Sequence, residues 1–293
     1  MSKYTTVGTG GPAEFFSRAG SPEELSELIA WSAANGQQLH VIGSGSNLLV
    51  ADEGVTGLVI KLDGELARIE FDGTRVECGG GARLPSVAAK AAAEGLTGLE
   101  FGVSIPGTVG GAVRMNANAY GGELARTLEW VDVATSSGVD RRTPDQFDFE
   151  YRRSNLAEGE VVCGAGFVLG ESQPGKVKAE LADLRARRKE AQPWGVKTFG
   201  STFKNPVDEK AEGKSAGQLL DAAGCRDLRI GGAGFSEKHA NFVVNHGEAT
   251  TSDVVAVMAE GRSKVHEMFG VSLEPEVQTL GPVNVPSDWR GGE

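Results

Sequence analysis

The chain has 293 residues, of which 40% are hydrophobic and 6% aromatic, with 42 glycines and a formal net charge of -11 at pH 7. This length allows one large domain or two to three small ones, each with enough core to fold independently. The acidic balance argues against a nucleic-acid partner, because binding a phosphate backbone requires a basic face.

The first elements in the chain are a helix and two short strands around a loop of small residues. Ser21, Pro22 and Glu24 are typical of a helix start, and this helix is expected to end at Gly36. Apolar strands are predicted at 39–42 and 48–50.

Between these strands lies the loop Gly43, Ser44, Gly45, Ser46 and Asn47. Consecutive backbone N–H groups of small residues form an anion-binding nest suited to a pyrophosphate. No Lys-Ser or Lys-Thr pair closes the loop, as in a P-loop, and a strand follows it rather than the helix of a dinucleotide fingerprint. The loop is therefore neither of the two commonest nucleotide motifs.

Residues 58–76 read as hairpins with turns at Asp63-Gly64 and Asp72-Gly73, and a helix is expected over 83–93. The next stretch, Phe101–Gly122, is poor in charge and dense in glycine. Glycine weakens helix and strand interiors, so this density indicates either backbone that approaches a flat or phosphorylated ligand or several tight turns. Strands at 128–134 and 161–169 complete an α+β pattern without regular βαβ alternation.

The polar segment 171–176, which contains Pro-Gly, marks a predicted domain boundary. We predict a domain of residues 1–170, a second of residues 171–281, and a disordered tail of residues 282–293. The second domain is expected to contain helices over 176–191, 215–224 and 251–269 and strands over 241–244 and 271–280.

The cysteines and the hydropathy of the chain indicate the cellular compartment in which the protein is expected. Cys78, Cys163 and Cys225 are far apart and lack C-x-x-C spacing, which favours small buried hydrophobes in a reducing environment over a disulfide framework. No His, Cys, Asp and Glu cluster has metal-ligand spacing, so no metal is predicted. Without an apolar run of about 18 residues or a leader pattern, we expect a cytoplasmic protein with no membrane insertion.

Seven segments, read in order, resemble the flavin-dependent UDP-N-acetylenolpyruvoylglucosamine reductases and extend from about residue 5 to 281. They are Thr5-Thr6 with Gly10–Ala13, Val41–Val50 (VIGSGSNLLV), Ile105–Asn116 (IPGTVGGAVRMN), Tyr151–Ser154 (YRRS), Gly200–Pro206 (GSTFKNP), His239–Asn245 (HANFVVN) and Leu273–Val277 (LEPEV). Ser104 and Asn118 depart from this pattern, because the family more often has glycine at both positions.

The resemblance implies an α+β FAD-binding fold of the vanillyl-alcohol-oxidase (PCMH) type, followed by a smaller α+β substrate-binding domain. By family pattern, Gly43 and Ser44–Asn47 would line the FAD pyrophosphate. The segment between pyrophosphate and flavin ring would consist of Ile105, Pro106, Gly107, Thr108, Gly110 and Gly111.

The implied reaction is the reduction of UDP-N-acetyl-3-O-(1-carboxyvinyl)glucosamine to UDP-N-acetylmuramate in peptidoglycan synthesis, with FAD as cofactor and NADPH as co-substrate. A hydride passes from NADPH to flavin N5 and then to the enolpyruvyl β-carbon, leaving negative charge on the α-carbon and its carboxylate. The UDP-sugar and NADPH are the expected partners of a monomer or weak oligomer.

Residue roles follow from the matching motif positions. Arg152 would face the developing enolate, and Ser201 would donate the proton to the α-carbon. Glu276 would be the orienting or polarising acid of the site. Arg153 is interpreted as structural. Glu274 stays an alternative to Glu276, because residues two apart on a strand point the same way.

Asn205 and His239 match substrate-contacting positions of the family. The short interval between Arg152 and Ser201 resembles the subgroup without the inserted tyrosine-bearing loop. Two other hypotheses remain open: a flavin oxidase of the same fold acting on a small hydroxy acid or alcohol, and a flavin-binding module without catalysis.

Overall fold

The computed structural model describes residues 1–286 and Trp289, and the chain divides into two compact units. Unit 1 contains residues 1–13, 45–55 and the chain from Lys189 onward, and unit 2 contains residues 14–44 and 56–188. Unit 1 is therefore assembled from three segments that are far apart in the sequence.

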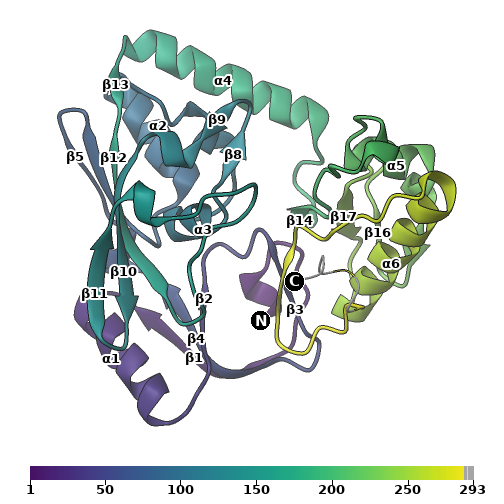
Figure 1. Ribbon diagram of the computed structural model, residues 1–293, viewed down its shortest axis with the longest axis horizontal. Helices are drawn as coiled ribbons and strands as arrows, with labels where there is room; N and C mark the ends of the chain where they lie inside the picture. Colours follow the sequence, from purple (N-terminus) through teal and green to yellow (C-terminus); the bar gives the residue numbers. More distant parts are fainter. Residues whose placement is uncertain (287–288, 290–293) are drawn as a thin grey trace. The chain divides into compact units, whose positions relative to one another are not determined.

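Unit 2 is built on a five-stranded antiparallel sheet of order β11-β10-β12-β6-β5. Its strands are β5 (Ile69–Asp72), β6 (Arg75–Gly79), β10 (Leu128–Thr135), β11 (Gly138–Arg142) and β12 (Val161–Val168). Apolar side chains of this sheet, including Val131 and Phe167, form one buried core with helices α2 (Leu84–Ala93) and α3 (Val109–Arg114). Figure 1 shows these two helices beside the sheet.

A smaller sheet of order β1-β4-β2 completes unit 2. Its strands are β1 (Ala13–Ala19), β2 (Leu39–Ile42) and β4 (Val55–Leu62), and helix α1 (Pro22–Ala34) covers it. Two short pairs, β7 (Leu96–Thr97) with β13 (Gly170–Glu171) and β8 (Asn118–Ala119) with β9 (Gly122–Glu123), complete the strand inventory of this unit.

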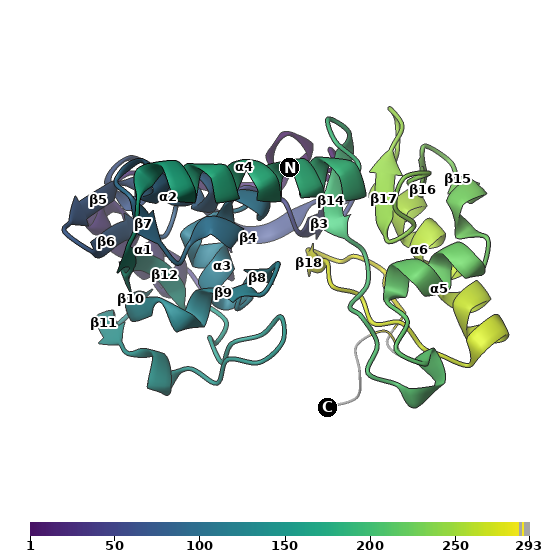
Figure 2. The same cartoon turned by 90° about the horizontal axis from the view of Figure 1, so that it is seen from above.

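Helix α4 (Pro174–Ala191) lies along α2, as Figure 2 shows. Val177, Leu181 and Leu184 of α4 pack with Ala88 and Ala92 of α2. Because this apolar contact joins α4 to unit 2, the division between the units falls at residues 188–189 and not at the predicted boundary near residue 171.

Unit 1 contains an antiparallel sheet of order β14-β17-β16-β15. The strands are β14 (Lys197–Ser201), β15 (Arg229–Ile230), β16 (Ala233–Phe235) and β17 (Phe242–Asn245), with helices α5 (Ala216–Ala222) and α6 (Thr251–Phe269). Leu219, Leu220, Val254 and Met258 of these helices share a buried core with Phe199 and Val243 of the sheet. In the same unit β3 (Leu48–Val50) pairs in parallel with β18 (Gln278–Leu280).

Short 3₁₀ turns connect these elements. They are η1 (Ser2–Tyr4), η2 (Gly64–Ala67), η3 (Glu100–Ser104), η4 (Leu124–Arg126), η5 (Pro144–Gln146), η6 (Glu209–Ala211) and η7 (Cys225–Asp227).

The helices follow the sequence signals closely. The helix predicted over 215–224 forms as α5, with Ser215 and Gln218 in a capping box at its start, and α6 covers the predicted range 251–269. Of the predicted turns, Asp72-Gly73 joins β5 to β6, whereas Asp63 caps the 3₁₀ turn η2.

The C-terminal strand predicted over 271–280 is wrong in extent, because only Gln278–Leu280 forms one. Pro275, which has no N–H, lies between and makes a single bridge with Phe203. The tail is also different where it is described: Val283, Val285 and Trp289 pack against the core of unit 1, contrary to the disorder predicted for residues 282–293. Residues 287–288 and 290–293 lie outside the described part.

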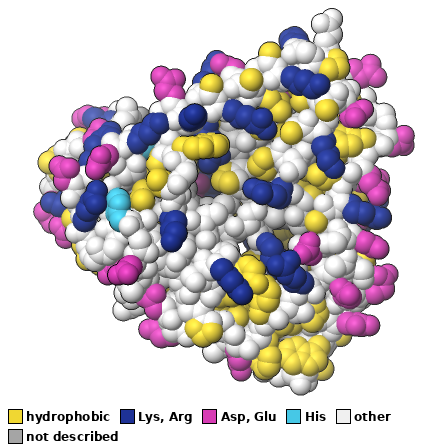
Figure 3. Space-filling view, turned by 180° about the vertical axis from the view of Figure 1, so that it is seen from behind, with side chains coloured by type: hydrophobic (Ala, Val, Ile, Leu, Met, Phe, Trp, Pro, Cys, Tyr) yellow, Lys and Arg dark blue, Asp and Glu magenta, His cyan; other side chains and the backbone are white. Residues whose placement is uncertain are grey.

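On the face shown in Figure 3, charged side chains are dispersed among uncharged ones, with exposed hydrophobic side chains between them. Such scattered exposure is normal for a folded domain. Across residues 1–286 and Trp289, no helix is both long and apolar enough to cross a membrane.

Candidate functional site

The loop Gly45–Asn47 of unit 1 is held in a conformation that only glycine permits at its first position. Gly45 has φ +63°, and a Cβ there would overlap the carbonyl oxygen of Tyr4. The Gly45 carbonyl accepts hydrogen bonds from the backbone N–H and the hydroxyl of Thr6, at 3.0 and 3.2 Å. Thr6 therefore fixes the loop from the carbonyl side.

The N–H side of the same loop carries open donors. Gly45 is buried, yet neither its N–H nor that of Asn47 donates to any residue that the structure describes. The other groups of Asn47 are used: its carbonyl accepts from the Gln278 N–H at 3.1 Å, and its side-chain amide donates to the Glu276 carbonyl at 3.1 Å. Open N–H groups in a glycine turn are the donor set that an anionic phosphate requires.

In unit 2, Gly43 and the segment Ile105–Gly111 lie against each other. A Cβ on Gly43 would overlap the hydroxyl of Thr108, so glycine is required for this close approach. Lys61 donates to the Gly43 carbonyl at 2.8 Å and holds the end of β2 in place. Two segments that the sequence assigned to the cofactor are thereby brought together within one unit.

The Ile105–Gly111 segment is fastened by its backbone. Leu84 N–H donates to the Gly107 carbonyl at 3.1 Å, and Gly110 N–H donates to the Gly80 carbonyl at 2.8 Å. Thr108 caps α3 by accepting from Gly111 N–H at 3.4 Å. Gly111 is exposed, and a Cβ there would meet only the Thr108 hydroxyl, at 3.6 Å. The segment thus has a fastened, uncharged backbone with three glycines, which fits a flat cofactor.

Arg152 occupies the third position of a tight turn that begins at Glu150. Glu150 and Arg153 exchange both backbone hydrogen bonds, at 3.1 and 3.2 Å, and Arg152 has φ +60°. A positive φ is uncommon for a residue with a side chain, and such residues concentrate at functional sites. The Arg152 guanidinium lies 5.1 Å from the Tyr151 ring centroid and donates to Asn118 Oδ1 at 2.9 Å.

Arg153 has a different environment. Its side chain is 75% exposed and lies 4.0 Å from the Glu150 carboxylate. A solvent-exposed pair of this kind contributes little to stability. The environment agrees with the structural interpretation given to Arg153.

Ser201 and Glu276 are brought close within unit 1 by backbone pairing. Glu276 N–H donates to the Thr202 carbonyl at 2.9 Å, and Lys204 N–H donates to the Glu274 carbonyl at 2.9 Å. Residues 274–276 therefore run antiparallel beside the strand that leaves Ser201. Within the described residues, the Ser201 hydroxyl makes no hydrogen bond, and its side chain is partly exposed.

The same pairing separates the two candidate glutamates. Glu274 is exposed and its carboxylate forms an ion pair with Lys204, at 3.3 Å. Glu276 is only partly exposed, and its carbonyl accepts from Asn47. Lys204, which lies three residues after Ser201, is thus engaged with Glu274.

Asn205 and His239 both make defined contacts in unit 1. Asn205 Oδ1 accepts from the Ala216 N–H at 3.1 Å, at the start of α5. His239 Nδ1 accepts from the Asn241 N–H at 3.2 Å, and its ring packs edge-on against Phe242. Burial and then the nearby Arg226 lower the pKa of His239, so a neutral imidazole with a protonated Nε2 is favoured.

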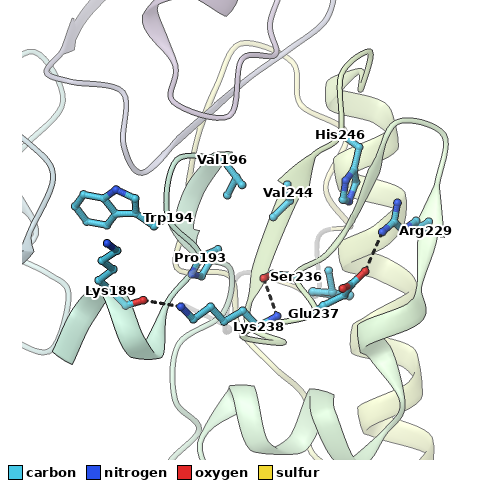
Figure 4. Close-up of a pocket in the computed structure, with 11 residues that line it drawn as sticks. Lys189, Pro193, Trp194, Val196, Arg229, Ser236, Glu237, Lys238, Val244 and His246 are labelled. Atoms are coloured by element: carbon cyan, nitrogen blue, oxygen red, sulfur yellow. Dashed lines mark hydrogen bonds and ion pairs between the residues drawn. The ribbon is translucent and has the colours of Figure 1, made fainter. Parts of the chain in front are cut away.

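A pocket of about 560 Å³ lies elsewhere in unit 1 (Figure 4). Trp194, Lys189, Lys238 and Arg229 are among its lining residues, and Arg229 pairs with Glu237 at 3.3 Å. None of the predicted site residues lines it. The described residues also contain no group of His, Cys, Asp and Glu arranged to hold a metal ion.

Sequence reasoning missed two residues that hold the predicted ones. Asn118 was noted only as a departure from the family pattern, although it contacts Arg152. Thr6 was noted as part of a motif, but nothing in the neighbouring sequence indicates that it bonds to Gly45, 39 positions away.

Comparisons with known proteins bear on the whole chain. Residues 13–143 match an FAD binding domain, and residues 192–280 match the C-terminal domain of UDP-N-acetylenolpyruvoylglucosamine reductase. The first match confirms the predicted FAD-binding fold and the cofactor class.

Individual relatives cover nearly the full length. UDP-N-acetylenolpyruvoylglucosamine reductase 2 of Symbiobacterium thermophilum is 40% identical over 96% of this chain and 90% of its own. The reductase of Agathobacter rectalis is 43% identical over 96% of this chain and 92% of its own. The crystal structure of the reductase from Thermus caldophilus superposes with a TM-score of 0.83 at 38% identity, covering 95% of this chain and 96% of that one. The chain belongs to the UDP-N-acetylenolpyruvoylglucosamine reductase family.

Proposed function

We propose that this protein reduces UDP-N-acetyl-3-O-(1-carboxyvinyl)glucosamine to UDP-N-acetylmuramate in peptidoglycan synthesis, with FAD as cofactor and NADPH as reductant. The observation that carries the proposal is identity of 40–43% to named reductases over 96% of the chain. The substrate, the reductant and the residue roles below are parts of this proposal.

FAD, when bound, supplies the hydride chemistry. The open N–H groups of Gly45 and Asn47 suit its pyrophosphate, because backbone donors bind phosphate without requiring a cationic side chain. The fastened backbone of Ile105–Gly111 suits the region between the pyrophosphate and the flavin ring, since it carries no charge and contains three glycines that allow close approach.

Three side chains handle the charge that the reduction creates. Arg152 holds the substrate carboxylate with its planar fork of donors, which matches two carboxylate oxygens. The Ser201 hydroxyl donates the proton to the α-carbon, and Glu276 orients or polarises the reacting group. The two alternatives have charged neighbours of their own: Arg153 lies 4.0 Å from Glu150, and Glu274 pairs with Lys204.

Asn205 and His239 are proposed to contact the UDP-sugar. The neutral His239 would donate from Nε2, because its Nδ1 already accepts from a backbone N–H. The Asn205 carboxamide oxygen caps α5, so the NH₂ group is the part that we assign to the substrate.

The test is spectroscopic. Purified protein should show the visible spectrum of bound FAD, lose it on anaerobic addition of NADPH, and regain it when the enolpyruvyl UDP-sugar is added. Protein that takes up no FAD would refute the proposal. Rapid reoxidation by oxygen without the sugar would favour an oxidase instead, and stable flavin without turnover would favour a binding module.

A further inference from the structure

The hairpin β8–β9 carries Asn118 to the guanidinium of Arg152. Asn118 Oδ1 accepts from Arg152 Nη1 at 2.9 Å, and the Asn118 carbonyl lies 3.4 Å from the same nitrogen. Arginine only donates, so the side-chain atom that faces it at this distance must be the amide oxygen. We propose that Asn118 is a positioning residue that orients Arg152 toward a substrate carboxylate; this inference rests on the proposed function.

Asn118 is well placed for this task because its hairpin has a tight turn and packs on the core. Tyr120 and Gly121 have φ of +51° and +83°, the left-handed values of a tight two-residue hairpin turn. A Cβ on Gly122 would overlap the ring of Phe101, so the hairpin packs directly on a buried aromatic. Strand pairing places Asn118 opposite Glu123. The side chain therefore extends from a fixed backbone.

Arg152, in contrast, belongs to a turn that needs support. Its φ of +60° is costly for a residue with a side chain, by about 1–2 kcal/mol in the left-handed region. A second asparagine, Asn116, holds the base of the turn, because its amide donates to the Glu150 carbonyl at 3.2 Å and to the Glu123 carboxylate at 3.0 Å. Asn118 Nδ2 reaches the Asn116 carbonyl at 3.5 Å. The turn and the guanidinium are thus held by neighbouring residues of one segment.

The chemistry of the contact also matters. An amide oxygen accepts from the guanidinium and fixes its direction, but it brings no negative charge. A carboxylate at the same position would compete with an anionic ligand for Arg152, since both bind the same donor fork. A neutral acceptor orients the cation without adding a negative charge that would compete with an anionic ligand.

The test measures binding, independently of turnover. UDP-N-acetylmuramate carries the carboxylate that Arg152 is proposed to hold, and UDP-N-acetylglucosamine lacks it, so the ratio of their dissociation constants reports on this contact. Isothermal titration of the FAD-loaded wild type should show tighter binding of UDP-N-acetylmuramate. Asn118→Leu, which keeps the size and removes the acceptor, should reduce this preference about 10-fold while the affinity for UDP-N-acetylglucosamine changes little.

Asn118→Asp tests the role of charge. It keeps the shape and the acceptor, and we expect a similar loss of preference, because the added carboxylate competes for Arg152. Asn155→Leu is the matched control: this exposed asparagine lies three residues after Arg152 and bonds to the Gln146 carbonyl. It should leave the preference unchanged.

A double-mutant cycle separates positioning from a general structural role. In an Arg152→Lys background, Asn118→Leu should have no further effect on the preference. Additive losses, or an unchanged preference in Asn118→Leu protein that melts at the wild-type temperature, would overturn the inference and leave the proposed function intact. A wild type that binds both nucleotides equally would instead refute the carboxylate contact on which both depend.

Discussion

Removing the Ser201 hydroxyl should slow the second half of the reaction without weakening the fold. Ser201 lies at the end of β14, opposite Phe242, and its hydroxyl makes no hydrogen bond to a described residue. Ser201→Ala therefore loses no internal hydrogen bond, and we expect the free energy of unfolding to change by no more than about 0.5 kcal/mol. A positioned proton donor contributes about 10²–10⁴ in rate, which equals about 2.7–5.4 kcal/mol in the barrier.

The assay is stopped-flow absorbance of the flavin in two separate experiments. Bleaching by NADPH should keep its wild-type rate in Ser201→Ala, and reoxidation by the enolpyruvyl UDP-sugar should slow by the factor above. Thr202→Val is the contrasting control, because the buried Thr202 hydroxyl accepts from the Val243 N–H at 3.2 Å. It should cost about 1–2 kcal/mol of stability.

Two outcomes would contradict the assignment. Equal slowing of both half-reactions by Ser201→Ala would mean that the hydroxyl supports the site as a whole. A large loss of stability would mean that it is a structural residue like Thr202.

Three further changes test other parts of the site. Gly45→Ala should abolish retention of FAD through gel filtration, because the new Cβ would overlap the Tyr4 carbonyl. The control Gly73→Ala, where φ is +57° and nothing lies within 4 Å, should lower only the melting temperature. Equal FAD content in the two variants would refute the loop assignment. In steady-state assays Glu276→Gln should reduce kcat at least 10-fold. Glu274→Gln should reduce it by less than 2-fold, since Glu274 is an exposed partner of Lys204. A larger loss of kcat in Glu274→Gln than in Glu276→Gln would exchange their roles. Burial raises the pKa of Cys78 to about 12, so iodoacetamide at pH 9 should leave this thiol unmodified in the native protein and modify it in denaturant, as measured by mass spectrometry. Because only the unfolded thiol ionises in this range, the free energy of unfolding should fall as the pH rises above about 9.

Local signals were sufficient for much of the fold. The helix that begins after Thr250 was predicted over its full length from its apolar period, and in the structure the Thr250 cap and Gly270 lie at its two ends. Signals of this kind fail where the deciding contact is distant. The strand predicted over 271–280 is interrupted because Pro275 faces Phe203, a pairing that only the folded chain reveals.

The division into units was also beyond local reading. Residues 45–55 belong to unit 1 because β3 pairs with β18, more than 220 positions later. Helix α4 belongs mainly to unit 2 because Val177 and Leu181 pack on α2. A polar Pro-Gly segment indicated a boundary nearby, but the apolar face of the following helix decided where it falls.

The site shows the same limit in its two ambiguous pairs. Spacing alone left Glu274 and Glu276 equivalent, and the choice between Arg152 and Arg153 depended on motif register. In the fold, members of each pair have different surroundings: Glu274 meets Lys204, and Arg152 meets the amide of Asn118. Asn118 would have been dismissed on its size alone as a tolerated replacement for glycine. Its contact with Arg152 gives it a task that no glycine performs. Of the two residues that depart from the family pattern, Asn118 is therefore the one whose substitution is most informative about how this chain holds its arginine.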